Sequence, residues 1–328
     1  MSILVTGGAG YIGSHTVRAL QRQNRTVAVY DNLVKGHRQA VAGAPLIIGD
    51  LQETDKLETV LKEYGIDCVV HFAAHSLVGE SMTQPRKYYD NNVIGTMKLL
   101  DTLVKNNIGK IVFSSTAAVY GEPEEVPITE EARKNPTNVY GRTKLMIEQI
   151  LADYDAAYGL KYMTLRYFNA CGADQDGTIG EDHRPESHLI PLVLAAALGM
   201  RENIQVFGAD YPTPDGTCIR DYIHVDDLAE AHILALDALQ GGAASQVYNL
   251  GNGSGFSVRE VIETAQRVTG REIKVAEAPR REGDPAVLIA SSAKIKKDLG
   301  WGPKKPGLEE IIASAWKWHG QNPHGFGE

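Results

Sequence analysis

The chain has 328 residues, of which 43% are hydrophobic and 23% are charged, which predicts about two globular domains with a large core. Its formal net charge of -8 argues against a general nucleic-acid binder. No apolar run reaches the roughly 18 residues of a membrane span, and the three cysteines show no metal or redox spacing, so we expect a cytoplasmic protein.

Short apolar runs alternate with helical patterns through the first half of the chain. Continuous apolar runs are typical of strands that are covered on both faces, as in parallel sheets. The pattern predicts a Rossmann-like, doubly wound parallel α/β sheet. Strands are predicted over residues 3–6, 26–30, 46–48, 68–73, 110–114 and 162–168, and helices over residues 11–21, 55–64, 86–106 and 140–158.

The pattern changes after Asn169. Residues 172–186 and 208–217 have the composition of loops. They are followed by predicted helices over residues 226–239, 257–270, 292–299 and 308–320, and by a strand over residues 247–250. We expect residues 1–169, joined by about 223–250, to form a nucleotide-binding domain. Residues 170–222 and 251–328 would form a smaller C-terminal α/β domain that binds the substrate at the carboxyl edge of the sheet.

A glycine-rich turn joins the first predicted strand to the first helix. Gly7, Gly10 and Gly13 are three residues apart, a spacing that permits a tight turn and a close approach to a pyrophosphate at a helix N-terminus. Asp31 ends the next strand, eighteen residues past Gly13, where a carboxylate binds ribose hydroxyls. Because that carboxylate repels a 2′-phosphate, we expect NAD rather than NADP.

Two polar residues end the next two strands. Asp50 is placed either to accept from the adenine amine or as an ordinary strand-end aspartate. For His71, packing is the better interpretation than catalysis.

A tyrosine and a lysine lie four residues apart on a predicted helix. That spacing puts Tyr140 and Lys144 on one face, where the lysine charge favours a phenolate whose ordinary pKa is about 10. Thr116 follows the fifth strand and would orient a substrate hydroxyl beside Tyr140, the predicted base. The chain has no GxSxG motif, so its sequence does not support Ser/His/Asp hydrolase chemistry. His183 and His188 lie near acidic residues, but without the sequence pattern of a metal site.

With these motifs in place, the chain resembles the extended short-chain dehydrogenase/reductase family and, within it, the UDP-glucose (UDP-galactose) 4-epimerases. The similarity extends along essentially the whole chain. Further matching stretches are 30–33 (YDNL), 78–81 (VGES), 88–92 (YYDNN), 113–121 (FSSTAAVYG), 166–169 (RYFN), 207–217 (FGADYPTPDGT), 220–225 (RDYIHV), 248–251 (YNLG) and 280–284 (RREGD).

The resemblance implies a reaction in which NAD stays bound and is not consumed. Tyr140 takes the O4 proton while hydride leaves C4, the 4-keto sugar turns about its phosphate linkage, and hydride returns to the opposite face. The resemblance also implies a homodimer through residues 86–106 and 140–158. The implied cofactor contacts are Gly7, Gly10, Tyr11, Ile12, Gly13, Asp31, Asn32, Asp50, Leu51, Phe72, Ala73, Asn91, Tyr140, Lys144 and Phe168. The implied UDP-sugar contacts are Thr116, Tyr140, Asn169, His188, Leu189, Gln205, Phe207, Arg220, Arg281, Asp284 and Leu288.

Three positions depart from the commonest pattern of these epimerases. Ser76 stands where a lysine is frequent, and His188 stands where an asparagine is usual. Leu288 corresponds to the gate of the hexose pocket, where a tyrosine narrows the pocket and a smaller residue admits an N-acetyl group. Leucine is intermediate, so UDP-N-acetylhexosamines remain open as additional substrates.

Two alternative functions share this fold. A nucleotide-sugar 4,6-dehydratase needs an acidic pair after the threonine, whereas Thr116 is followed by Ala117 and Ala118. A non-catalytic NAD-sensing protein usually lacks the tyrosine or the lysine, and this chain retains both.

Overall fold

A seven-stranded parallel sheet forms the centre of the computed structural model, which describes residues 2–41, 43–281 and 284–327. Its strand order is β11-β6-β5-β4-β1-β2-β3, so the chain winds outward from β1 in both directions. The six predicted strands of the first half are confirmed to within a few residues. The sheet consists of β1 (Ser2–Thr6), β2 (Thr26–Asp31), β3 (Leu46–Ile48), β4 (Ile66–His71), β5 (Lys110–Ser114), β6 (Lys161–Arg166) and β11 (Gln246–Asn249).

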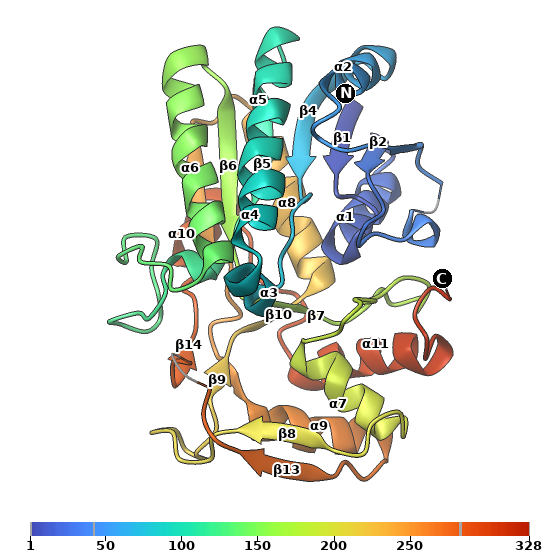
Figure 1. Ribbon diagram of the computed structural model, residues 1–328, viewed down its shortest axis with the longest axis vertical. Coiled ribbons are helices and arrows are strands. Elements are labelled where there is room, and N and C mark those ends of the chain that lie inside the picture. The colour runs from blue at the N-terminus through green and yellow to red at the C-terminus, as the bar shows by residue number, and fades with distance from the viewer. Residues whose placement is uncertain (1, 42, 282–283, 328) are drawn as a thin grey trace.

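Helices cover both faces of this sheet (Figure 1). Side chains alternate along β1: Ile3 and Val5 join the core beneath α1 and α8, and Leu4 joins the core beneath α2, α5 and α6. Both faces are therefore dry, which explains the continuous apolar runs in the sequence. These helices are α1 (Tyr11–Arg22), α2 (Thr54–Glu63), α5 (Gly95–Lys105), α6 (Val139–Tyr158) and α8 (Val225–Gln240).

The predicted helix over residues 86–106 is interrupted in the structure. It divides into α4 (Pro85–Tyr88), the π-helical turn η2 (Tyr89–Ile94) and α5, and a short α3 (Val78–Thr83) precedes it. Asn92, inside η2, accepts from the His75 backbone N–H at 2.9 Å and donates to the His75 carbonyl at 3.0 Å. A π-helical turn of this kind often marks a functional site.

Most of the remaining elements gather at one end of the sheet, in the lower half of Figure 1. Helices α7 (Leu189–Ala197), α9 (Val258–Thr269) and α11 (Leu308–Gln321) share a second core. None of the helices in the described ranges combines the length and apolarity needed to cross a membrane. The other elements are α10 (Ala293–Leu299), the short 3-10 turns η1 (Arg38–Ala40) and η3 (Ala117–Val119), and strands β7 (Asn169–Cys171), β8 (Ile204–Phe207), β9 (Ile219–Arg220), β10 (Tyr222–His224), β12 (Phe256–Ser257), β13 (Val275–Ala278) and β14 (Val287–Leu288).

The sequence analysis missed α7 and these seven short strands. Strands of two to four residues are too short to show a periodic pattern. The segment of α7 is apolar on every side and contains Pro191, which a helix tolerates because it falls in the first turn. The predicted loops over 172–186 and 208–217 are confirmed, since neither contains a helix or a strand.

Candidate active site

The glycine-rich turn between β1 and α1 leaves no room for a side chain at Gly7 or Gly13. Gly7 has a φ of +73°, and a Cβ there would lie 2.5 Å from the Ala73 nitrogen. A Cβ on Gly13 would lie 2.2 Å from the Gly7 carbonyl oxygen. The turn is thus packed against the end of β4 and against its own helix, as a close approach of backbone to a ligand requires.

The N-terminus of α1 is open to an anion. Gly10 is the residue that caps the helix, and it has no side chain with which to bond the amides of the first turn. Those N–H groups and the helix dipole favour a phosphate. The structure therefore fits a dinucleotide at the place where the spacing predicts one.

Asp31 is fixed against this turn at the end of β2. Its Oδ2 accepts from the Ala9 backbone N–H at 3.0 Å, and its Oδ1 accepts from the Leu33 N–H at 2.8 Å. Burial raises the pKa of the carboxyl, and these two N–H groups oppose that rise. The carboxylate is thus held in one orientation beside the turn.

The other predicted cofactor residues surround the same edge of the sheet. The amide of Asn32 donates to Asp50 Oδ2 at 2.9 Å, which joins the ends of β2 and β3. Leu51 is buried beside them, whereas Asn91 lies in η2 and donates to Asn92. Ile12, Phe72 and Ala73 flank the glycine turn on α1 and just after β4.

His71 is a packed residue, as predicted. Its Nδ1 lies 2.7 Å from Thr6 Oγ1 and its Nε2 lies 2.9 Å from Thr96 Oγ1, so both ring nitrogens are hydrogen-bonded. Burial lowers its pKa to about 3, which keeps the imidazole neutral.

The predicted catalytic residues meet where β5 ends against the first turn of α6. Asn138 caps this helix by accepting from the Gly141 N–H at 2.8 Å. The Lys144 ammonium lies 5.9 Å from the centre of the Tyr140 ring and donates to the Ser114 carbonyl at 2.8 Å. Thr116 lies two residues beyond β5, where its hydroxyl accepts from the Ala118 N–H at 3.1 Å, and its side chain is close enough to Tyr140 to influence the pKa of the phenol.

Burial dominates the titration of this pair. It raises the pKa of Tyr140 to about 12, although the Thr116 side chain acts in the opposite direction. It lowers the pKa of Lys144 to about 7, although the charge of Glu148 opposes this. The sequence analysis considered only the attraction between the lysine charge and a phenolate. In the folded protein, removal from water has the larger effect on both groups.

A buried ion pair lies beneath the pair and was missed by the sequence analysis. Glu148, one turn beyond Lys144 on α6, accepts from the Ser115 hydroxyl at 2.5 Å and from Arg166 Nε at 2.9 Å. Arg166, on β6, also donates to the Tyr120 hydroxyl at 2.7 Å. The only local signal was the spacing of four residues between Lys144 and Glu148. Nothing in the sequence indicated that β6 supplies the partner.

The substrate-half residues converge through short strand pairings. Arg220 on β9 forms an ion pair with Asp284, and Leu288 on β14 stands opposite Arg220 in the parallel register. Asn169 begins β7 and donates its side-chain amide to the Asp221 carbonyl at 2.9 Å. The pairing of β7 with β10 thus places Asn169 opposite Tyr222, two residues after Arg220 in the chain.

Leu288 and Phe168 pack against the segment that follows Thr116. Both contact a small buried cluster composed of Ala117, Val119, Tyr120 and Ile128. Leu288 therefore lies near the segment that follows Thr116, and its role as the gate of the hexose pocket stays a prediction.

A cavity of about 670 Å³ lies beside the substrate-half residues and includes Arg281 and Asp284 in its wall. The Arg281 guanidinium lies 4.0 Å from the centre of the Phe207 ring, on β8. Gln205 is exposed on the same strand. The residues between Arg281 and Asp284 in the matching stretch, Glu282 and Gly283, are outside the described ranges.

Comparison with known proteins identifies the family. The profile of the NAD dependent epimerase/dehydratase family matches residues 3–251, which include the glycine turn and the Tyr140–Lys144 pair. This chain belongs to that family.

Several proteins that the chain resembles along nearly its whole length are named UDP-glucose 4-epimerases. A UDP-glucose 4-epimerase of Halalkalibacterium halodurans is 57% identical over 326 residues, which are 99% of this chain and 98% of that protein. A crystal structure of a UDP-glucose 4-epimerase superposes with a TM-score of 0.98 at 54% identity and covers 99% of both chains. The Bifidobacterium longum UDP-glucose 4-epimerase, crystallised with NAD+ and UDP, has a TM-score of 0.92 at 42% identity and covers 99% of this chain and all of that one.

The side chain of His188 lies beside two glutamates, and its proposed contact with UDP stays a prediction. His188 caps α7, next to Leu189, and its Nδ1 lies 2.8 Å from Glu181 Oε1 and 2.9 Å from Glu186 Oε1. The ring is therefore engaged with two carboxylates. The sequence analysis found no metal pattern around His183 and His188, yet the structure gathers both histidines and both glutamates into one cluster.

Proposed function

We propose that this protein interconverts UDP-glucose and UDP-galactose by inverting C4 of the hexose with a bound NAD. The observation that carries the proposal is the meeting of Tyr140, Lys144 and Thr116 at the end of β5, on the sheet edge where the glycine turn opens. A tyrosine held beside a nicotinamide site is suited to removing a proton from an alcohol while hydride leaves the same carbon.

The residues around the glycine turn would hold the cofactor. When bound, NAD+ supplies an acceptor and then a donor of hydride, and its positive charge favours a phenolate beside it. The amides of the first turn of α1 would bind the pyrophosphate, and Asp31 would bind the adenosine ribose and disfavour a 2′-phosphate. The remaining contacts proposed are Gly7, Gly10, Tyr11, Ile12, Gly13, Asn32, Asp50, Leu51, Phe72, Ala73, Asn91 and Phe168.

Tyr140 would act first as the base that takes the O4 proton and later as the acid that returns it. Thr116 would hold the sugar hydroxyl in reach, because its side chain lies beside Tyr140. Lys144 would supply positive charge to the phenolate and bond to the nicotinamide ribose, while its bond to the Ser114 carbonyl fixes its direction.

The substrate half would hold the nucleotide end while the hexose turns. Arg220 and Arg281 are the candidates for the diphosphate, since a guanidinium can bond two of its oxygens together. Asp284 already orients Arg220 through their ion pair. Asn169, together with the backbone around His188 and Leu189 and around Gln205 and Phe207, completes the proposed contacts to UDP.

The chain would accordingly have two domains. Residues 1–169 and about 223–250 would form the NAD-binding domain, since β11 lies in the central sheet and α8 packs on α1. Residues 170–222 and 251–328 would form the UDP-sugar domain around the second core. We further propose a homodimer through α5 and α6, and a cytoplasmic location, which suits the free thiols of Cys68, Cys171 and Cys218.

An assay without added cofactor tests the activity. Purified protein should convert UDP-galactose to UDP-glucose with no NAD supplied, because the cofactor is regenerated in each cycle. Tyr140→Phe should lower kcat by at least about 100-fold, the usual contribution of a general base, with little change in UDP binding. Tyr158→Phe, on the same helix but exposed, is the matched control and should keep full activity. Full activity of Tyr140→Phe would refute its role as base, and a 4-keto-6-deoxy product would indicate the dehydratase.

Leu288 gives a reason to test UDP-N-acetylgalactosamine in the same assay. We propose that leucine leaves room for the acetamide, so that both substrates turn over. Leu288→Tyr should then lower kcat/KM for the N-acetyl substrate much more than for UDP-galactose. An equal loss on both substrates would show that Leu288 does not form the gate.

A further inference from the structure

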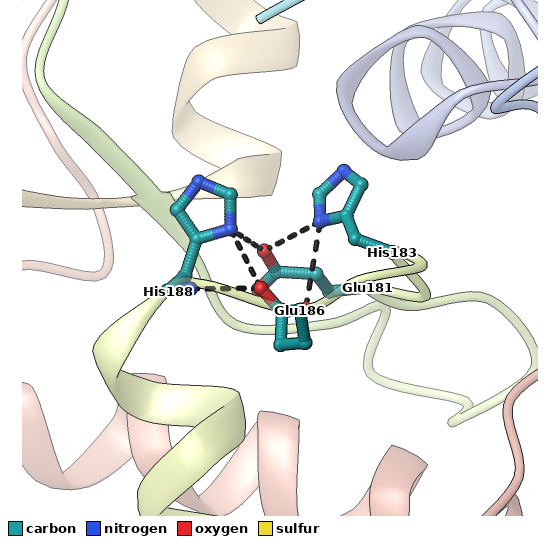
Figure 2. Close-up of side chains that lie close together, drawn as sticks. All are labelled: Glu181, His183, Glu186 and His188. Carbon is teal, nitrogen blue, oxygen red and sulfur yellow. Dashed lines mark hydrogen bonds and ion pairs between the residues drawn. The ribbon is translucent and has the colours of Figure 1, made fainter. Parts of the chain in front are cut away.

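Two glutamates and two histidines from one short segment converge in front of α7. Figure 2 shows Glu181, His183, Glu186 and His188 with their carboxylates between the two imidazole rings. One ligand-type atom from each of the four lies within 4.8 Å of all the others. The segment belongs to the long connection between β7 and α7, in which no helix or strand is described.

The spacing of these atoms suits a tetrahedral metal ion. His188 Nδ1 lies 2.8 Å from Glu181 Oε1 and 2.9 Å from Glu186 Oε1, and His183 Nδ1 lies 3.1 Å and 3.5 Å from the same two side chains. Tetrahedral ligands at about 2.0–2.2 Å from Zn²⁺ stand roughly 3.4 Å apart. Small movements of the side chains would therefore open the cluster to admit one ion.

The charge of the cluster is compatible with a divalent cation that replaces two protons. Glu181 is only 4% exposed, and both carboxylates contact the two histidines. Burial opposes a charge on His183 and His188, but their contacts with the two glutamates raise the pKa of these imidazoles to about 9 and about 10, so without a metal two protons balance the carboxylates. One divalent ion would neutralise both carboxylates and use the lone pair on Nδ1 of each histidine.

We propose that Glu181, His183, Glu186 and His188 form a closed structural site for one Zn²⁺ ion. Two imidazoles disfavour Mg²⁺ and Ca²⁺, which prefer oxygen ligands. Four protein ligands leave no open position, which is typical of structural rather than catalytic zinc.

The site would fasten a long loop beside the cofactor turn. The His183 ring meets the Tyr11 ring edge-on, with centres 6.1 Å apart, and the Tyr11 hydroxyl donates to the Gly172 carbonyl at 2.6 Å. Two parts of the loop thus contact Tyr11, the first residue of α1. This role goes beyond the proposed epimerase activity and does not depend on it.

Metal content is the first test. Untagged protein, stripped with a chelator, is loaded with excess Zn²⁺ in a thiol-free reductant, desalted and analysed. We expect one equivalent of zinc per chain. His183→Gln and Glu186→Gln should each weaken Zn²⁺ binding by at least about 100-fold, since even outer-shell changes cost about 10–100-fold. The controls His324→Gln and Glu202→Gln change exposed residues of the same types outside the cluster and should bind zinc like the parent.

Coordination geometry is the second test, and its cobalt measurement needs only the parent protein. Loading with Co²⁺ should produce the intense visible absorption of a tetrahedral site, and excess Zn²⁺ should abolish it. Zinc should also raise the thermal midpoint of the parent protein but not of His183→Gln. Zinc below 0.1 equivalent per chain, or a weak octahedral cobalt spectrum, would overturn the proposal. If the variants are less stable than the parent by the same amount with and without zinc, the cluster is held only by hydrogen bonds between its side chains.

Discussion

Gly13 illustrates how one hydrogen atom in place of a side chain permits the cofactor turn. A Cβ at this position would meet the backbone of Gly7 at 2.2 Å, and backbone cannot move aside as a flexible side chain can. We expect Gly13→Ala to reduce the NAD that copurifies with the protein by more than about tenfold, the equivalent of about 1.4 kcal/mol. Gly79→Ala is the control, because its Cβ would meet nothing within 4 Å. Equal NAD content in the two variants would contradict the proposed cofactor site.

Lys144 links the chemistry of the site to stability. Its pKa is about 7 in the folded protein, against an ordinary value of 10.5. Between these pH values the unfolded chain binds more protons than the folded one, so this residue makes the free energy of unfolding rise with pH, by about 1.4 kcal/mol per pH unit at most. Below pH 7 both states are protonated and the full cost of burying the charge is present.

Lys144→Met should remove this rise while keeping the length of the side chain. Urea unfolding of cofactor-free protein between pH 6 and pH 10 measures this rise. The free energy of unfolding of the variant, relative to that of the parent, should be highest at pH 6 and should decrease progressively toward pH 10. Lys297→Met, at an exposed position, should show the same pH dependence as the parent. A constant difference between parent and Lys144→Met at all pH values would show that Lys144 is not buried as a charge.

At the scale of elements, the Glu148–Arg166 pair ties α6 to β6 beneath the active site. Both side chains are buried, with exposed fractions of 6% and 4%. Removing one partner of such a pair leaves the other charge buried without compensation. Glu148→Gln should therefore lower the free energy of unfolding by about 3–5 kcal/mol in chemical denaturation. The control Glu58→Gln breaks two surface pairs with lysines and should change stability little. Similar effects of the two changes would contradict this role for α6.

The elements also show why some predictions succeeded and others failed. Strands β1, β2 and β5 are continuous apolar runs, so their sequence pattern is strong and local. The π-helical turn η2 depends on hydrogen bonds between Asn92 and His75, seventeen residues earlier in the chain. The strand β9 has two residues and exists because β12 and β14 flank it. Contacts of this kind leave no periodic pattern in the sequence.

For the whole molecule, exposed apolar side chains on α5 and α6 support the proposed dimer. Met97 is 39% exposed on α5 and Met146 is 40% exposed on α6, both on the side of the sheet that these helices cover. Placing a charge at each should separate the subunits, because an uncompensated charge in an apolar interface is costly. We expect light scattering to give a dimer mass for the parent and a monomer mass for the double variant Met97→Glu/Met146→Glu. Val275→Glu, an equally exposed apolar position on β13, should remain dimeric, and a monomeric parent would refute the interface.

The sequence by itself determined the parallel α/β fold, the glycine turn with Asp31, and the pairing of Tyr140 with Lys144. Each of these depends on the spacing of residues within one or two adjacent elements. Regular backbone geometry there determines which side chains lie on the same face. Only the tertiary structure decided the pKa values of Tyr140 and Lys144, because they follow from burial. It also decided the placement of Leu288 opposite Arg220, and the convergence of Glu181, His183, Glu186 and His188 in one cluster. These features depend on how segments without a periodic pattern fold against the rest of the chain, and spacing along the sequence does not specify such contacts.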